Sequence, residues 1–293
     1  YSVATDENGG VYVTGITTSF GVKQYGYGDL LLVKYDSAGR LLWKRTWGGT
    51  GSERGKAVVV DSDGTILIGG DTGSYKMADG AGLVILRYNS IGNLVQHWAW
   101  CDLDEAYLTA MTLDNSGNIL LTADVWDHEE SNDGVLLAKF GPDGAFLWSR
   151  CWDGADHEYG RAVAVDAAGD IYVVGNTQDY PHCNGVLLLK YDPNGALLWQ
   201  RAWNGAGYYG GWALAFSEDG SMYIGGSAHS ALGEWEEISG NVSAYAGSVV
   251  KPSGYTIAKP SGTVTYCSGI ETTPAGVQGE GGLLVMKLEE PSF

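Results

Sequence analysis

The sequence predicts an all-β fold, a five-bladed β-propeller made of four-stranded blades of about 50 residues. An apolar triplet recurs with successive spacings of 55, 53, 52 and 51 residues. No segment of the chain shows the apolar spacing of a helix. The five triplets are Val11–Val13, Ile66–Ile68, Ile119–Leu121, Ile171–Val173 and Met222–Ile224.

Each triplet follows a short turn, which places it on the second strand of a hairpin. The turns carry Asp or Ser early and Gly late, and Gly supplies the positive φ that such hairpins need. We expect the turn Asp to bind its own backbone. The five turns are DENGG at Asp6, DSDG at Asp61, DNSG at Asp114, DAAG at Asp166 and SEDG at Ser217.

The second half of each copy predicts two more strands. A buried run, a basic residue and an aromatic residue lead into a four-residue turn, and the next strand ends in Trp. We expect the paired Trp rings to pack between blades or over the outer edge. Copy two has Gln96 where the other copies have Trp. The four segments are LLLVKYDSAGRLLWKRTW from Leu30, LVILRYNSIGNLVQHWAW from Leu83, VLLAKFGPDGAFLWSRCW from Val135 and VLLLKYDPNGALLWQRAW from Val186.

Copies that lack closed cores of their own must stack, so we expect one domain over residues 1–293. The predicted blades cover about 1–55, 56–107, 108–160, 161–211 and 212–293. The last copy contains an insertion at about 234–281, in which Tyr255–Ala258 and Thr263–Tyr266 suggest a β-ribbon that projects from the body. It also lacks the Trp-bearing fourth strand, so the last blade is expected to be incomplete.

Copy four carries a recognisable pattern between Gly160 and Trp199. It reads G-x-A-V-A-V-D-x-x-G-x-I-Y-V-x-G and then K-Y-D-x-x-G-x-L-L-W. The pattern resembles the bacterial and archaeal SBBP-type β-propeller repeats, and more weakly the propeller repeats of quinoprotein dehydrogenases. The resemblance implies a propeller over nearly the whole chain, and a fold by itself does not specify a function.

Charge and composition exclude some partners. Lys and Arg total 17 against 35 Asp and Glu, a net charge of -18. Such a surface repels phosphate backbones, so we expect no nucleic acid partner. No apolar run approaches the ~20 residues that span a bilayer, so no membrane insertion is expected.

Three features favour an extracellular or cell-surface location. The chain begins at Tyr1 like a processed protein, Asn241 lies in a glycosylation sequon, and the four cysteines form no CxxC motif. Cys183 and Cys267 fall in loops of adjacent copies and are candidates for a disulfide that ties the insertion down. Four free thiols would instead argue against secretion.

Function is expected on the face that carries the second-to-third-strand loops and the connections between blades. These loops vary in length and content, and irregular loops on a rigid scaffold commonly bind partners. An acidic loop that is merely solvated is the alternative. The candidate binding residues are Trp126, Asp127, His128, Glu129, Asp156, His157, Tyr180, His182, Tyr208, Tyr209 and Trp235.

We expect a non-enzymatic binding or assembly propeller without catalytic residues or cofactors. A divalent metal site at Asp127, His128 and Glu129 is a further hypothesis, since such side chains bind zinc or similar ions. The expected partner is a protein or a glycan, or other copies of this chain that exchange strands at the incomplete blade. The alternative is a carbohydrate-active enzyme or lectin with carboxylates and aromatics at the central channel mouth.

Overall fold

The computed structural model is built from β-strands. It describes residues 1–19, 28–74, 82–100, 105–127, 132–154, 157–178, 184–205, 209–228, 233–237, 241–243, 249–250 and 282–288. Within these ranges no helix has the length and apolar character needed to cross a membrane.

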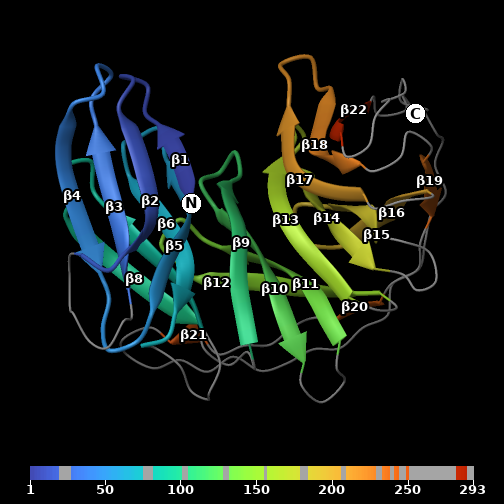
Figure 1. Cartoon of the computed structure of the whole chain (residues 1–293), viewed down its shortest axis with the longest axis horizontal. Helices are drawn as coiled ribbons and strands as arrows, with labels where there is room; N and C mark the ends of the chain where they lie inside the picture. The colour runs from blue at the N-terminus through green and yellow to red at the C-terminus, as the bar shows by residue number, and fades with distance from the viewer. Residues whose placement is uncertain are drawn as a thin grey trace.

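Five antiparallel sheets follow one another along the chain (Figure 1). Sheet 1 contains β1 (Ser2–Thr5), β2 (Val11–Thr17), β3 (Asp29–Tyr35) and β4 (Leu41–Trp47). Sheet 2 contains β5 (Glu53–Val60), β6 (Ile66–Thr72), β7 (Gly82–Tyr88) and β8 (Leu94–Trp100). Sheet 3 contains β9 (Glu105–Leu113), β10 (Ile119–Asp127), β11 (Asn132–Phe140) and β12 (Phe146–Asp153). Sheet 4 contains β13 (His157–Val165), β14 (Ile171–Gln178), β15 (Asn184–Tyr191) and β16 (Leu197–Gly205), and sheet 5 contains β17 (Tyr209–Phe216), β18 (Met222–Ala228) and β22 (Gly282–Leu288).

The all-β repeat of four-stranded units is therefore confirmed for the first four copies. A single parallel bridge between the backbones of Asp133 in β11 and His157 in β13 links sheets 3 and 4.

The hairpin turns have the predicted chemistry. Gly39 and Gly144, which close the turns between the third and fourth strands of sheets 1 and 3, have φ of +76° and +77°. In the turn between β9 and β10, Asp114 accepts hydrogen bonds from the backbone N–H groups of Ser116 and Asn118, both at 2.9 Å. Its second oxygen pairs with Lys139 of β11 at 2.8 Å. The turn carboxylate thus fixes both the hairpin and the neighbouring strand.

The ion pair between Asp114 and Lys139 predicts an acid-dependent loss of stability. Burial acts to raise the pKa of Asp114, but hydrogen bonds from Lys139, Asn118 and Ser116 outweigh it and leave the pKa lowered. The unfolded chain therefore takes up this proton first, so the stabilisation is present above about pH 4 and is lost as the pH falls through the folded pKa. We expect Asp114→Asn to flatten the decline of the urea midpoint below about pH 4. Lys139→Met should change the midpoint much less in the Asp114→Asn background than in the wild type, and equal effects in both would contradict the pairing.

Each sheet packs face to face against the next one in chain order. We call the face toward the next sheet the forward face and the opposite one the rear face. Between sheets 1 and 2, for example, Tyr12, Leu30 and Leu32 meet Ile66 and Ile68 in one apolar cluster. Three similar clusters lie between the later sheets. The core is therefore a series of inter-sheet layers.

The predicted Trp packing lies in these layers. Trp43 of sheet 1 covers Gly92 of the next sheet, and Trp148 covers Gly195 in the same way. In copy two, Trp98 covers Gly144 instead of the residue at position 96. Copy two has Gln96 where the other copies have the packing tryptophan. Trp98, two residues further along the same face of the strand, fills that role.

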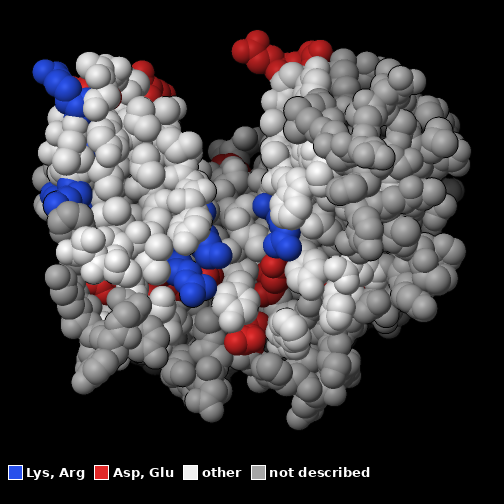
Figure 2. All heavy atoms as spheres, in the orientation of Figure 1, with Lys and Arg blue, Asp and Glu red and all other residues white. Residues whose placement is uncertain are grey.

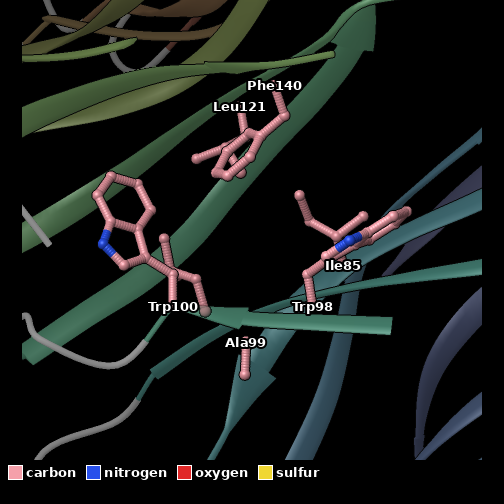
Figure 3. A pocket seen from close by; sticks show the side chains of 7 residues that line it. Ile85, Trp98, Ala99, Trp100, Leu121 and Phe140 are labelled. Carbon is pink, nitrogen blue, oxygen red and sulfur yellow. The ribbon is translucent and has the colours of Figure 1, made fainter. Parts of the chain in front are cut away.

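A small cavity lies in the layer between sheets 2 and 3. Trp98 and Trp100 of β8 line it from one side, and Leu121 and Phe140 line it from the other (Figure 3). Its volume is about 10 Å³, roughly the space of one water molecule, and its lining is apolar. It is a packing defect of the core.

The first part of the insertion packs along the body of the protein. Three short strands, β19 (Gly233–Glu237), β20 (Asn241–Ser243) and β21 (Val249–Val250), pair in turn with the outer strands of sheets 4, 3 and 2. An outer strand offers unpaired backbone groups, and the insertion satisfies part of them. The ribbon segments Tyr255–Ala258 and Thr263–Tyr266 lie outside the described residues, as do Cys183 and Cys267.

The five sheets form an arc, and the described strands form no closed barrel. Figure 1 shows sheet 1 and sheet 5 on opposite sides of an opening, with β1, β5, β9, β13 and β17 along the inside of the arc. Sheet 5 has three described strands, as the incomplete last copy predicts. The closure expected of a five-bladed propeller is not found.

Candidate functional site

The innermost strands of sheets 2 to 5 share one irregularity. Each contains a β-bulge, an extra residue that the neighbouring strand does not pair with. The bulged residues occupy equivalent positions in successive copies, and Tyr1 occupies the same position in copy one. Bulges redirect side chains and occur often beside binding sites. The bulged residues are Lys56, Thr109, Arg161 and Trp212.

A side chain of the preceding sheet holds each of the last three bulges in place. Asp71 accepts a hydrogen bond from the Leu108 N–H at 2.7 Å, and Asp124 accepts one from the Gly160 N–H at 2.9 Å. Asn176 accepts one from the Gly211 N–H, also at 2.9 Å. A bulge frees a backbone donor from the ladder, and these acceptors satisfy it. The position of the bulged residues is therefore fixed by contacts between sheets.

Aromatic and cationic side chains alternate along the inside of the arc. The Lys56 ammonium lies 5.7 Å from the ring centre of Tyr1. The Arg161 guanidinium lies 5.0 Å from the ring centre of Tyr159 and 5.5 Å from that of Trp212. Figure 2 shows this side hollowed between the two ends of the arc, with basic and acidic atoms on the walls near β5 and β13.

A buried carboxylate, Asp71, and a half-buried one, Asp124, lie behind the cations. Asp71 pairs with Lys56 at 3.6 Å, and Asp124 pairs with Arg161 at 2.9 Å. Burial raises the pKa of Asp71 although Lys56, the Leu108 N–H and Arg54 act in the opposite direction. Carboxylates with a shifted pKa beside a hollow are common at functional sites.

The two ends of the arc carry apolar faces that none of the described sheets covers. On the rear face of sheet 1, Val3 is 63% exposed and Val13 is 36% exposed. Their equivalents in sheet 2, Val58 and Ile68, are 5% and 0% exposed because sheet 1 covers them. On the forward face of sheet 5, Tyr223 is 37% exposed. The end faces thus have the residue pattern of the inner layers without their partners.

The structure brings together two of the residues predicted from sequence. Trp126, at the end of β10, is exposed, and its ring centre lies 6.4 Å from that of His157 at the start of β13. Tyr209 is instead buried in the layer between sheets 4 and 5, because its position on β17 faces sheet 4. Its ring is therefore not available to a surface ligand.

The other predicted positions cannot be described at side-chain level. Asp127 and Trp235 lie in β10 and β19, and Asn241 lies in β20. The remaining predicted positions, His128, Glu129, Asp156, Tyr180, His182 and Tyr208, lie outside the described residues. Among the described side chains no group of three or more His, Cys, Asp and Glu residues is placed to hold a metal ion.

Sequence reasoning missed the bulged residues, although a signal was present. In the pattern G-x-A-V-A-V-D the variable position x is the bulge, as in Gly160-Arg161-Ala162. The glycine before it is required by packing, since a side chain at Gly160 would contact Thr122 of the preceding sheet. On the innermost strands of sheets 2, 4 and 5, a variable residue beside a packed glycine marks the inside of the arc.

Comparisons with known proteins agree with the fold. No family model matches the chain, and no curated protein matches it. It is similar to a solved structure of a protein of unknown function from Dyadobacter fermentans, with a TM-score of 0.53 and 14% identity over 87% of this chain and 83% of that one. A second match is the extracellular domain of a putative one-component system, BT4673, from B. thetaiotaomicron, with a TM-score of 0.20 and 9% identity over 90% of this chain and 54% of that one.

The first match supports an all-β architecture of repeated four-stranded sheets. The chain is therefore an all-β protein of repeated four-stranded antiparallel sheets, an architecture consistent with a propeller-like repeat protein.

Proposed function

We propose that this chain is an open five-bladed propeller of the SBBP type that acts as a non-enzymatic binding or assembly module outside the cell. Its partner is a protein or glycan, or another copy of itself. The observation that supports assembly most directly is the pair of uncovered apolar faces at the ends of the arc.

The two end faces are complementary because each is equivalent to one side of the layers that pack between successive sheets. Inside the arc, the forward face of each sheet packs on the rear face of the next. The forward face of sheet 5 exposes Tyr223, and the equivalent Tyr172 of sheet 4 is fully buried under sheet 5. A second copy that placed its sheet 1 on this face would bury Val3 and Val13 as Val58 and Ile68 are buried within the chain. Such head-to-tail contacts generate rings or filaments.

Sheet 5 also offers an edge. In sheets 1 to 4 a fourth strand pairs with the third, whereas among the described residues no strand pairs with the outer edge of β22. A strand from another copy could add there by backbone hydrogen bonds. Face and edge lie on the same sheet, so a single partner could occupy both.

The expected result is that the protein self-associates and that Val3→Asp weakens the association at least about tenfold, or about 1.4 kcal/mol. A carboxylate buried in an apolar interface is costly, which is the physical reason for the loss. Sedimentation velocity over a range of concentrations measures the effect. Self-association should strengthen with added salt, because copies with a net charge of -18 repel one another.

Val95→Asp is the matched control. Val95 lies on the outer strand β8 and is 61% exposed, close to the exposure of Val3, but it is not on an end face. We expect its effect on association to stay within about twofold. A protein that remains monomeric at every concentration and salt level, or equal effects of both variants, would rule out assembly through the end faces.

A further inference from the structure

The inside of the arc has the features of a ligand site, independent of the end faces. Bulged side chains from four sheets face it, and Asp71, Asp124 and Asn176 of the preceding sheets hold three of these bulges. A site on strands fixed in this way is pre-organised, so it loses little entropy when a ligand binds.

Trp212 presents an exposed ring on this surface, as Tyr1 does at the equivalent position of sheet 1. The Trp212 side chain is 53% exposed, and its indole N–H donates to the Ser227 hydroxyl at 3.2 Å. The guanidinium of Arg161 lies beside the ring and is itself held by Asp124. An immobilised, half-exposed indole ring is well suited to stack on a flat apolar surface of a ligand.

The charges of the surface select among ligand classes. Lys56 is paired with the buried Asp71 and Arg161 with the half-buried Asp124, so neither cation is available in full to neutralise an anion. The chain also carries a net charge of -18, which repels phosphates and polyanions at long range. Lys carries three N–H donors and Arg carries five, so each paired cation can also donate to neutral polar groups, and a phenolic hydroxyl can both donate and accept.

We propose that the inside of the arc binds a neutral oligosaccharide, with one sugar ring stacked on Trp212 and its hydroxyls bound by Arg161, Tyr159 and Lys56. A pyranose combines an apolar ring face with a rim of hydroxyls, which matches an aromatic platform flanked by hydrogen-bonding groups. This inference deepens the proposed binding role by naming the ligand class and does not depend on assembly.

The test is calorimetric titration of the whole chain with cellohexaose, xylohexaose, mannohexaose and chitohexaose, with hexagalacturonic acid as the charged counterpart. We expect at least one neutral hexasaccharide to bind and to change the tryptophan fluorescence, and the acidic one to bind more weakly. Trp212→Ala should weaken binding of the neutral ligand at least about tenfold. Trp212→Phe should retain most of the affinity because an aromatic ring remains.

Trp43→Ala is the matched control. Trp43 also carries an arginine over its ring, at 5.0 Å from Arg45, but it lies on the outer strand β4. Its loss should leave affinity within about twofold at temperatures where both variants are folded. Failure of all four neutral sugars to bind, preference for the acidic one, or equal losses in both variants would overturn the inference. Repeating the titration with the Val3→Asp variant separates this outcome from a failure of assembly.

Discussion

Gly144→Ala is expected to destabilise the protein by about 3 kcal/mol, because it adds two independent costs. Gly144 has φ of +77°, which strains any residue with a Cβ atom. The added methyl group would also overlap the ring of Trp98, which is buried between sheets 2 and 3. The ring has little room to move, since it is buried and the cavity beside it measures about 10 Å³. Urea unfolding followed by tryptophan fluorescence measures the loss.

Gly39→Ala separates the two costs. Gly39 lies in the same kind of turn in sheet 1, has φ of +76°, and has no atom within 4 Å of an added Cβ. The Gly39→Ala variant should lose only about 1 to 2 kcal/mol of unfolding free energy, which is the cost of the strained backbone. Equal losses for Gly39→Ala and Gly144→Ala would show that the tryptophan contact contributes nothing. Trp98→Leu in the Gly144→Ala background should recover part of the loss if overlap is its cause.

Glu53→Ala should cost about 3 kcal/mol, because it removes a buried acceptor and leaves its donors unpaired. Glu53 is fully buried at the start of β5. Its carboxylate accepts the backbone N–H groups of Gly49 at 3.0 Å and Ser74 at 3.1 Å, and the Ser74 hydroxyl. These contacts tie the connection between sheets 1 and 2 to the segment that follows β6. Thermal and urea unfolding both report the change.

Two variants bracket this prediction. Glu53→Gln keeps one acceptor oxygen and should lose less than Glu53→Ala. Glu7→Ala removes an exposed carboxylate from the turn between β1 and β2 and should stay within about 0.5 kcal/mol. A loss for Glu53→Ala no larger than that of Glu7→Ala would show that the loop donors find water or other partners.

The repeated four-stranded units could be predicted from the sequence because their signals are local. The turn glycines, the apolar triplets and the terminal tryptophans each act within one hairpin or one inter-sheet layer. The insertion could not be placed, because the pairing of β21 with β8 depends on contacts between distant parts of the chain. Loop composition contains no information on which edge such a segment will meet.

The residues inside the arc could not be predicted for a related reason. Charged and aromatic loop residues such as Trp126 stand out in the sequence, whereas Lys56 and Trp212 look like ordinary members of short strands. Only the bulge directs them to the inside of the arc, and a bulge depends on pairing register. Tyr209 shows the converse, since an aromatic residue beside a loop became part of the core.

The strands β19, β20 and β21 change how the protein can fold. Stacked repeats that contact only their neighbours can form one after another and can unravel from either end. Here the outer edges of sheets 2, 3 and 4 are completed by a segment that leaves the ribosome after all three sheets. The pairing of Val249 with Trp100 therefore forms late, at a high cost in loop closure. Once formed, it couples the middle of the array to its last repeat, so the sheets should melt as one cooperative unit.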